Sequence, residues 1–385
     1  MTTRPALRTF SILAALLLAA SGRAAAPATS APKQEFFVFY GSPNSSRTDG
    51  ISLGRFDAAS GKLTAPTLAA QAGGPSFVAL APDGKHLYAC FESTNEVGAY
   101  AIDAATGELR LLNVQPAGGG GPCHLSLDRS GKFALVANYN GGSVALFPIM
   151  SNGTLGPRTG FDQHTGKGPN ADRQEGPHAH GIITDPSNRF ALCADLGNDT
   201  LHLYRFDARS GTLVPHATTK LAPGAGPRHV LFSPNGKALY CLNELDGTLT
   251  TFDWDAEKGA LTNPTTVRNL PAGFTAFNKN AELQLHPNGK FLYASARGHD
   301  AIAVFAVDAA TSRLTLVQDA PTGAKTPRFF GFDPTGKWIL CGNQDSNTVT
   351  VFKADAATGK LTIVGDPVTA PAPICMVFLP VTAAK

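Results

Sequence analysis

The sequence of 385 residues has few charged side chains, which make up 16% of it, and its formal net charge is only +3. It also has no local basic run, so we expect no nucleic-acid partner. Aromatic residues amount to 8%, which argues against large stacking platforms. Turn-forming residues, in contrast, are abundant: 40 Gly and 28 Pro predict many tight turns.

The N-terminal apolar run, Phe10 to Ala20, is too short to cross a bilayer, which takes about 20 residues. Arg4 and Arg8 precede this run and small residues follow it at positions 24–26, which is the order of a secretory signal peptide. We therefore expect residues 1–26 to be a signal peptide, cleaved within residues 24–28, and residues 27–34 to be a linker. The mature protein is then expected to be periplasmic or secreted, with no membrane span.

Two turn phrases recur along the chain. Clear copies of the first, Asp-Ala-Ala-x-Gly-x-Leu, begin at Asp57, Asp103 and Asp355, and looser copies end at Leu155, Leu213, Leu261 and Leu314. The second, Pro-x-Gly-Lys or a degraded form of it, begins at Pro82, Arg129, Pro186, Pro234, Pro287 and Pro334. Short alternating runs between them have the length of strands. Four strands per unit of roughly 45–55 residues are typical of a propeller blade. The sequence therefore predicts an all-β, seven-bladed β-propeller over residues 35–380, with 381–385 as a tail.

The two ends of the chain are predicted to share one blade. A seventh copy of the second phrase is missing, Phe36 to Tyr40 has the pattern of a second strand, and Ile374 to Leu379 has that of a first strand. Their pairing would close the ring and remove the exposed sheet edges of an open array. Closed rings have few edges to share, so we expect a monomer.

The six cysteines could form disulfides in an exported protein. Cys193, Cys241 and Cys341, however, each fall seven residues after the start of the second phrase, and Cys90 falls eight after it. Equivalent positions in different blades should lie beyond the ~7 Å limit between Cα atoms for a disulfide. These cysteines are therefore predicted to be small buried fillers, and their spacing is not that of a zinc site.

The register of the repeats predicts which residues share one end of the channel. Six residues before each second phrase stand Ser76, Cys123, His180, Arg228, Ala281 and Arg328, and the next position includes His124, His229 and Glu282. The second strands end near Glu92, Asn138, Asp195, Asn243, Glu244, Arg297, Asn343 and Gln344. In an antiparallel hairpin the start of one strand lies beside the end of the other. We therefore expect these polar residues to gather around one opening, as a binding site.

The chemistry of this rim favours an anionic ligand. Arg228, Arg297 and Arg328 can hold a carboxylate or phosphate, while His180 and Glu244 can move protons. Structural ion pairs between blades are the alternative for any single rim residue. Residues expected to contact substrate are His124, His178, His229, Asn138, Asn243 and Gln344. The long loop from Gln163 to Pro177 is expected to be a lid or a contact element, with Arg173 as its candidate.

Several motifs resemble a known family. Gly176-Pro-His-Ala-His180, Gly226-Pro-Arg-His229, Asn243-Glu244, Ala296-Arg-Gly-His299 and Asn343-Gln-Asp345 look like signatures of the propeller lactonases. This family includes propeller-type 6-phosphogluconolactonases and fungal 3-carboxy-cis,cis-muconate lactonizing enzymes. The resemblance covers residues 35–380 and implies hydrolysis or formation of a lactone without a metal or organic cofactor. By motif it implies His180, Arg228, Glu244 and Arg297 as the catalytic set.

The expected partner is a small anionic lactone. Arginines would hold its carboxylate or phosphate, Glu244 or His180 would act as general base, and the other would protonate the departing alkoxide. Phosphorylated sugar lactones belong to the cytosol, so an exported chain is expected to act on an unphosphorylated sugar lactone or another carboxylated ring. A muconate-type cycloisomerase and a non-catalytic binding propeller remain alternatives. A further alternative is a metal-dependent lactonase, whose ligands would be Glu92, Asn138, Asp195, Asn243 and Asn343. The central arginines argue against this alternative, because they would repel the cation.

Overall fold

The computed structural model describes residues 1–2, 34–43 and 50–381, and the regular structure of these residues is almost entirely β-strand. The predicted signal peptide, its cleavage zone and the linker fall outside the described residues, except at positions 1–2 and 34. Within the described part of the chain, no helix combines the length and the apolar character needed to cross a membrane.

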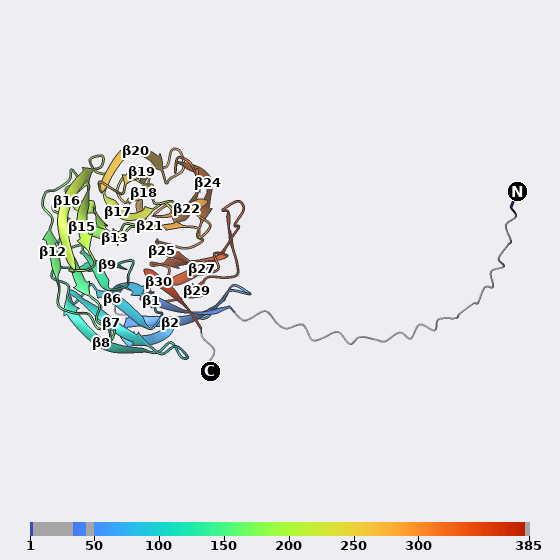
Figure 1. The fold of residues 1–385 in the computed structure, drawn as a ribbon, viewed down its shortest axis with the longest axis horizontal. Coiled ribbons are helices and arrows are strands. Elements are labelled where there is room, and N and C mark those ends of the chain that lie inside the picture. The colour runs from blue at the N-terminus through green and yellow to red at the C-terminus, as the bar shows by residue number, and fades with distance from the viewer. Residues whose placement is uncertain (3–33, 44–49, 382–385) are drawn as a thin grey trace. The chain divides into compact units, whose positions relative to one another are not determined.

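The strands of the described residues form seven antiparallel sheets, arranged as blades around a central channel (Figure 1). The blade that holds both chain ends contains β1 (Glu35–Gly41), β2 (Gly50–Asp57), β3 (Lys62–Leu63), β4 (Thr67–Gln71) and β30 (Cys375–Pro380). The next two blades contain β5 (Pro75–Leu80), β6 (His86–Phe91), β7 (Glu96–Ile102) and β8 (Leu109–Pro116), then β9 (Pro122–Leu127), β10 (Phe133–Asn138), β11 (Ser143–Pro148) and β12 (Gly160–Gln163).

The other four blades follow in chain order. The first two are β13 (Ala179–Thr184), β14 (Phe190–Asp195), β15 (Thr200–Asp207) and β16 (Thr212–Lys220), with the 3-10 helix η1 (Leu196–Asn198), then β17 (Pro227–Phe232), β18 (Ala238–Asn243), β19 (Thr248–Asp255) and β20 (Ala260–Arg268). The last two are β21 (Lys279–Leu285), β22 (Phe291–Arg297), β23 (Ala301–Val307) and β24 (Leu314–Pro321), then β25 (Pro327–Phe332), β26 (Trp338–Asn343), β27 (Thr348–Ala354), β28 (Leu361–Ile363) and β29 (Val368–Thr369).

The ring closes as predicted. The innermost strands are β5, β9, β13, β17, β21, β25 and β30, and each contacts the next, with β30 touching both β25 and β5. β30 also pairs with β1, where Val38 lies opposite Phe378. Figure 1 shows β30, near the C-terminus, beside β1, near the N-terminus. The predicted seven-bladed fold, closed by a blade built from both ends, is confirmed.

The repeated phrases fold as turns. In the first phrase the backbone N–H groups of Ala105 and Thr106 both donate to Asp103 Oδ1 at 2.9 Å. The fifth position favours glycine because the backbone there is left-handed, with φ of +78° at Gly107. In the second phrase the preceding Asp185 accepts from the N–H of Phe190 at 2.8 Å. Each turn is therefore fixed by a short polar side chain and one left-handed residue, which is glycine in most copies but Asn188 and Ser312 in two of them.

The hydrophobic core lies between neighbouring blades, where the second strands are buried over most of their length. Cys90, Cys193, Cys241 and Cys341 occupy this core on β6, β14, β18 and β26. All six cysteines of the chain are buried and free, which agrees with the interpretation of these four as small fillers.

One irregularity recurs where the inner strands begin. Six of the seven inner strands carry a β-bulge against their neighbour, at Ser76, Cys123, His180, Arg228, Ala281–Glu282 and Arg328. A bulge leaves one residue outside the regular pairing and re-aims its side chain. The six positions that share one offset in the repeat register are therefore the bulged ones.

Candidate active site

A cavity of about 200 Å³ lies at this end of the channel. Its lining residues are Glu92, Cys123, Tyr139, Asn140, Arg173, His180, Glu244, Lys279, Arg297 and Arg328. Three of them, Cys123, His180 and Arg328, are bulged residues of inner strands. Glu244 and Arg297 come from the ends of second strands, or just beyond them. The structure thus brings together five of the predicted site residues: Arg173, His180, Glu244, Arg297 and Arg328.

Glu244 is the centre of this cavity and is held by three arginines. Its Oε1 accepts from Arg173 Nη2 at 2.8 Å, and its Oε2 lies 3.0 Å from Arg297 Nη2. Arg228 Nε lies 3.1 Å from Oε2 without directing its N–H there, so that contact is electrostatic rather than a hydrogen bond. The Glu244 side chain is only 3% exposed, which makes the attraction strong.

Charge on the arginines determines the protonation of Glu244. Burial acts to raise the pKa of this carboxyl, but attraction from the three guanidinium groups lowers it to about 2. For Arg297 the effect of burial is the opposite: it lowers the pKa to about 9, although the charge of Glu244 acts to raise it. Glu244 is therefore ionised near neutral pH and has no proton to donate.

His180 enters the cavity as a neutral imidazole. Burial, together with the charge of Arg228 and the neighbouring His229, lowers the pKa of His180 well below its usual value. Its ring lies edge-on to Tyr139, with 5.4 Å between ring centroids, and its Nδ1 is 3.9 Å from Cys123 Sγ. Cys123 and His180 do not form a catalytic Cys–His pair. Burial and the charge of Glu92 raise the pKa of the Cys123 thiol to about 12, so the reactive thiolate does not form near neutral pH.

Positive charge exceeds negative charge around the cavity. Five cations, Arg228 included, face the carboxylates of Glu92 and Glu244. In the part of the chain that the structure describes, Arg328 and Lys279 have no carboxylate within ion-pair distance. Lys279 also lies directly opposite Arg297 in the β21–β22 pairing, a like-charged pair that an anion between them would stabilise.

The long loop reaches the cavity as an anchored contact element. Arg173, near its middle, donates to both Glu244 and the hydroxyl of Tyr139, the latter at 3.0 Å. The adjacent Gln174 is fully buried and donates to Leu196 O at 2.8 Å and to Asp199 Oδ1 at 2.7 Å. These bonds fix the backbone beside Arg173 and thereby place its guanidinium.

Two predicted histidines lie deeper in the channel. His229 Nδ1 is 3.3 Å from Glu282 Oε2, and its ring is 5.1 Å from that of His124. Burial lowers the pKa of both histidines and raises that of Glu282 to about 7. With Phe77 they separate the cavity from a larger, mostly apolar one of about 620 Å³ at the opposite end, which His124 lines. Arg228 Nη1 lies 3.2 Å from His229 Nε2, so these neighbouring side chains are in contact, although Arg228 faces Glu244 and His229 faces Glu282.

The remaining predicted contact residues brace the blades. Asn138 donates to Ser143 Oγ at 3.2 Å, and Asn243 donates to Thr248 and Thr250 hydroxyls in its own blade. His178 Nδ1 lies 2.9 Å from Tyr139 O, and its ring stacks on the Tyr139 ring. Gln344 makes backbone hydrogen bonds at a turn. None of these four, all of them described residues, lines the cavity.

The residues of the metal-dependent alternative do not converge. Asn243 and Asn343 bind hydroxyl groups within their own blades, and Asp195 belongs to a separate buried cluster with His164. Only Glu92 of that set lines the cavity.

Lys279, Asn140 and Tyr139 are cavity residues that the sequence did not identify as contacts. Lys279 stands eight residues before the second phrase of its blade, at Pro287, whereas the comparison of repeats covered the positions six and five residues before it. Tyr139 directly follows the predicted Asn138, whose side chain turns into the blade instead. A search for cations two residues before each bulge would have found Lys279.

The fold and this cavity define a seven-bladed propeller with a cationic pocket at one end of its channel. The family described as "Lactonase, 7-bladed beta-propeller" matches residues 37–378, and the chain belongs to that family. The resemblance seen in the sequence motifs is thereby confirmed.

Its relatives match over most of their length. A 6-phosphogluconolactonase of Bacillus subtilis (strain 168) is 34% identical over 347 residues, which cover 90% of this chain and 99% of the relative. A 6-phosphogluconolactonase of Pectobacterium carotovorum is 34% identical over 298 residues, or 77% of this chain and 84% of the relative. Among solved structures, a periplasmic gluconolactonase of Pseudomonas aeruginosa has a TM-score of 0.85 at 28% identity, covering 90% of this chain and 100% of that one.

Proposed function

We propose that this protein is a lactonase that hydrolyses a sugar lactone or a related anionic lactone in the cavity around Glu244. The main support for this proposal is the cavity and its lining residues, together with the membership of the chain in the lactonase family. A neutral histidine there faces an excess of cations, and lactone hydrolysis needs both features. A proton must be moved, and negative charge develops on the carbonyl oxygen.

In the proposed mechanism His180 is the general base. It takes a proton from the water that attacks the lactone carbonyl carbon, and it returns this proton to the ring oxygen when the carbon–oxygen bond breaks. The product is an open hydroxy acid, whose carboxyl proton goes to solvent. Glu244 is ionised at neutral pH and cannot be the acid, so its role is to organise the arginines.

The arginines and Lys279 stabilise charge. Arg297 would lie against the carbonyl oxygen, with the charge of the buried Arg228 close by, while Arg328 and Lys279 would hold an anionic substituent. An anion bound there would also offset the positive charge that lowers the pKa of His180, and would make it a better base. The mechanism uses no metal or organic cofactor.

We propose further that the protein is exported and acts as a monomer. An exported enzyme would meet sugar lactones without a phosphate, and the name of the P. aeruginosa relative, a periplasmic gluconolactonase, supports this. The cation excess suits such a substrate as well, because hydrolysis of any lactone generates a carboxylate.

A panel of lactones tests the proposal. Purified protein in EDTA should hydrolyse gluconolactone or its 6-phosphate above the spontaneous rate, measured by proton release with a pH indicator. His180→Ala should abolish most of this activity, while His216→Ala, at a partly exposed site on the outer strand β16, should not. The proposal fails if no member of the panel is hydrolysed faster than in buffer, or if His180→Ala is as active as the wild type.

A further inference from the structure

A row of buried polar side chains runs behind the cavity, between β12, β14 and β15. His164 Nδ1 lies 2.5 Å from Asp195 Oδ2, and both side chains are completely buried. His164 Nε2 lies 2.6 Å from the Tyr204 hydroxyl, which is also 3.0 Å from Asp162 Oδ2. Both ring nitrogens of His164 therefore have a polar partner, and the Tyr204 hydroxyl bridges His164 and Asp162.

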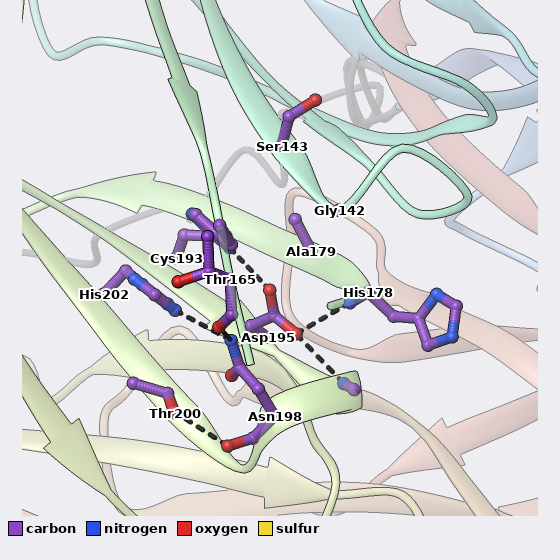
Figure 2. A network of polar contacts seen from close by, with 12 residues as sticks. Gly142, Ser143, Thr165, His178, Ala179, Cys193, Asp195, Asn198, Thr200 and His202 are labelled. Atoms are coloured by element: carbon purple, nitrogen blue, oxygen red, sulfur yellow. Dashed lines mark hydrogen bonds and ion pairs between the residues drawn. The ribbon is translucent and has the colours of Figure 1, made fainter. Parts of the chain in front are cut away.

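This row is connected to the cavity through the backbone of His178. Asp195 Oδ1 accepts from the N–H of His178 at 2.7 Å and from that of Gly197 at 3.0 Å (Figure 2). The His178 ring stacks on Tyr139 with 4.4 Å between centroids and 12° between planes. Tyr139 in turn accepts from Arg173, which donates to Glu244. Every step from His164 to Glu244 is thus a direct contact.

The pair formed by His164 and Asp195 also fixes β13, the strand that carries His180. Ala179 lies opposite Asp195 in the β13–β14 pairing, and the bulge at His180 follows immediately. Because Asp195 holds the backbone on one side of that bulge, a change in its position would turn the His180 ring.

A metal site is the competing interpretation, since His164, Asp195 and His202 bring ligand atoms within 4.8 Å of one another. The two imidazole rings, however, are stacked with 3.7 Å between centroids and only 7° between planes. Lone pairs in parallel rings run parallel and do not converge on one ion. His202 Nε2 faces Asn198 Nδ2 at 3.3 Å (Figure 2), and both nitrogens of His164 have partners. The geometry fits a hydrogen-bonded row better than a metal centre.

We propose that the His164–Asp195 pair is a positioning device for the candidate active site, acting through His178 and Tyr139 to set Arg173 against Glu244 and through β13 to orient His180. His164, Asp195 and Tyr204 are then positioning residues, which touch no substrate. The kinetic part of this inference rests on the proposed lactonase activity; the geometric part does not.

Two mild variants and a matched control test the kinetic part. Asp195→Asn removes the charge that faces His164, and Tyr204→Phe removes only a hydroxyl. The control is Asp185→Asn: Asp185 is equally buried and lies in the same hairpin, but at its opposite end. A displacement of catalytic groups by about 1 Å can cost a hundredfold in rate. We expect kcat to fall about tenfold to a hundredfold in the first two variants, with KM nearly unchanged, and to stay at the wild-type value in the control.

A double-mutant cycle separates positioning from general loss of stability. In an Arg173→Met background, which already lacks the last contact to Glu244, Tyr204→Phe should lower kcat much less than it does alone. If the variants lose thermal stability in parallel with Asp185→Asn while kcat stays unchanged, the row is only structural and the proposal is overturned.

Cys123 gives a readout that needs no lactone. Its thiol lies 3.7 Å from Ala179 O and 3.4 Å from His180 O, so it reports the position of this segment. Alkylation of Cys123 by iodoacetamide, followed by peptide mass spectrometry, should be severalfold faster in Asp195→Asn and Tyr204→Phe than in Asp185→Asn. If this rate changes while no variant or wild-type protein hydrolyses a lactone, the proposed function fails and the positioning role stands. Loss of activity in EDTA that Zn²⁺ restores would overturn the inference in favour of a metal site.

Discussion

Replacing Glu244 by Gln removes the one negative charge that three buried arginines share. The pKa of this carboxyl is about 2 in the folded protein, against an ordinary value of 4.5. Each pKa unit corresponds to about 1.4 kcal/mol, so the ionised carboxylate stabilises the fold by about 3 kcal/mol at neutral pH. That figure is close to the ~3–5 kcal/mol lost when one partner of a buried ion pair is removed. We expect Glu244→Gln to fold but to be about 3 kcal/mol less stable at pH 7.

The pH dependence of this loss has a definite sign. The pKa is lowered on folding, so the stabilisation is complete above about pH 4.5 and disappears as the pH falls towards 2. The gap in unfolding free energy between wild type and variant should therefore close over that window. Urea denaturation followed by fluorescence of Trp254 and Trp338, at pH 7, 4.5 and 3, measures it. Inorganic phosphate should stabilise the variant more than the wild type, because the arginines have lost their counter-charge; about 2.7 kcal/mol is expected at a hundred times Kd.

Two results would refute the reasoning. The first is a variant as stable as the wild type at pH 7, and the second is a gap that is the same at pH 3 as at pH 7. Glu257→Gln is the matched control, because Glu257 pairs with Arg189 on the surface and is 84% exposed there. Exposed pairs contribute little, so this control should not change stability measurably.

The remaining predictions concern rate, binding and assembly. His180→Ala should lower kcat by about a hundredfold or more in steady-state assays, and retention of the wild-type rate would exclude it as the base. The pKa of His180 lies well below its usual value in the free enzyme, so kcat/KM should not fall until the pH is well below 6.5. The parameter kcat reports the enzyme with the anion bound, and it should therefore fall at a higher pH than kcat/KM does. Arg328→Met and Lys279→Met should each raise KM about tenfold for a phosphorylated or carboxylated lactone and leave KM for a neutral one unchanged; equal effects on both substrates would contradict an anion-binding role. Deleting Ala372–Lys385 removes β30 and should prevent folding, and a soluble truncated protein with a native circular dichroism spectrum would show that ring closure is dispensable.

The repeat register predicted the fold and the place of the site because each blade has the same local chemistry. An Asp or Pro before a turn glycine dictates one turn in isolation, so seven copies can be counted without knowledge of their packing. His180, Arg228 and Arg328 share one offset from the second phrase, and in the structure each of them is the bulged residue of its inner strand. Sequence alone gave no reason to expect a bulge, since only one or two strand residues precede it in each inner strand, too few to show a break in the apolar pattern.

The direction of each side chain could not be predicted in this way. Asn138 and Asn243 end their strands at the rim, yet their amides donate to hydroxyl groups five residues further along the chain, at the start of the next strand. His229 follows Arg228 by one residue and contacts it, yet it pairs with Glu282 rather than with Glu244. Lys279 was missed because it lies eight residues before the second phrase, outside the two offsets that were compared between blades. Such outcomes depend on contacts between individual side chains, which a single sequence does not state.

The bulged positions have a consequence for how this scaffold can change its substrate. A residue outside the regular pairing contributes little to the ladder of hydrogen bonds that holds a blade together. New side chains can therefore be tried there one blade at a time, at small expense in stability. Ser76, Cys123 and Ala281 are small, whereas His180, Arg228 and Arg328 are large. Three of these positions, Cys123, His180 and Arg328, line the cavity, so enlarging the small Cys123 is the simplest route to a cavity of different selectivity.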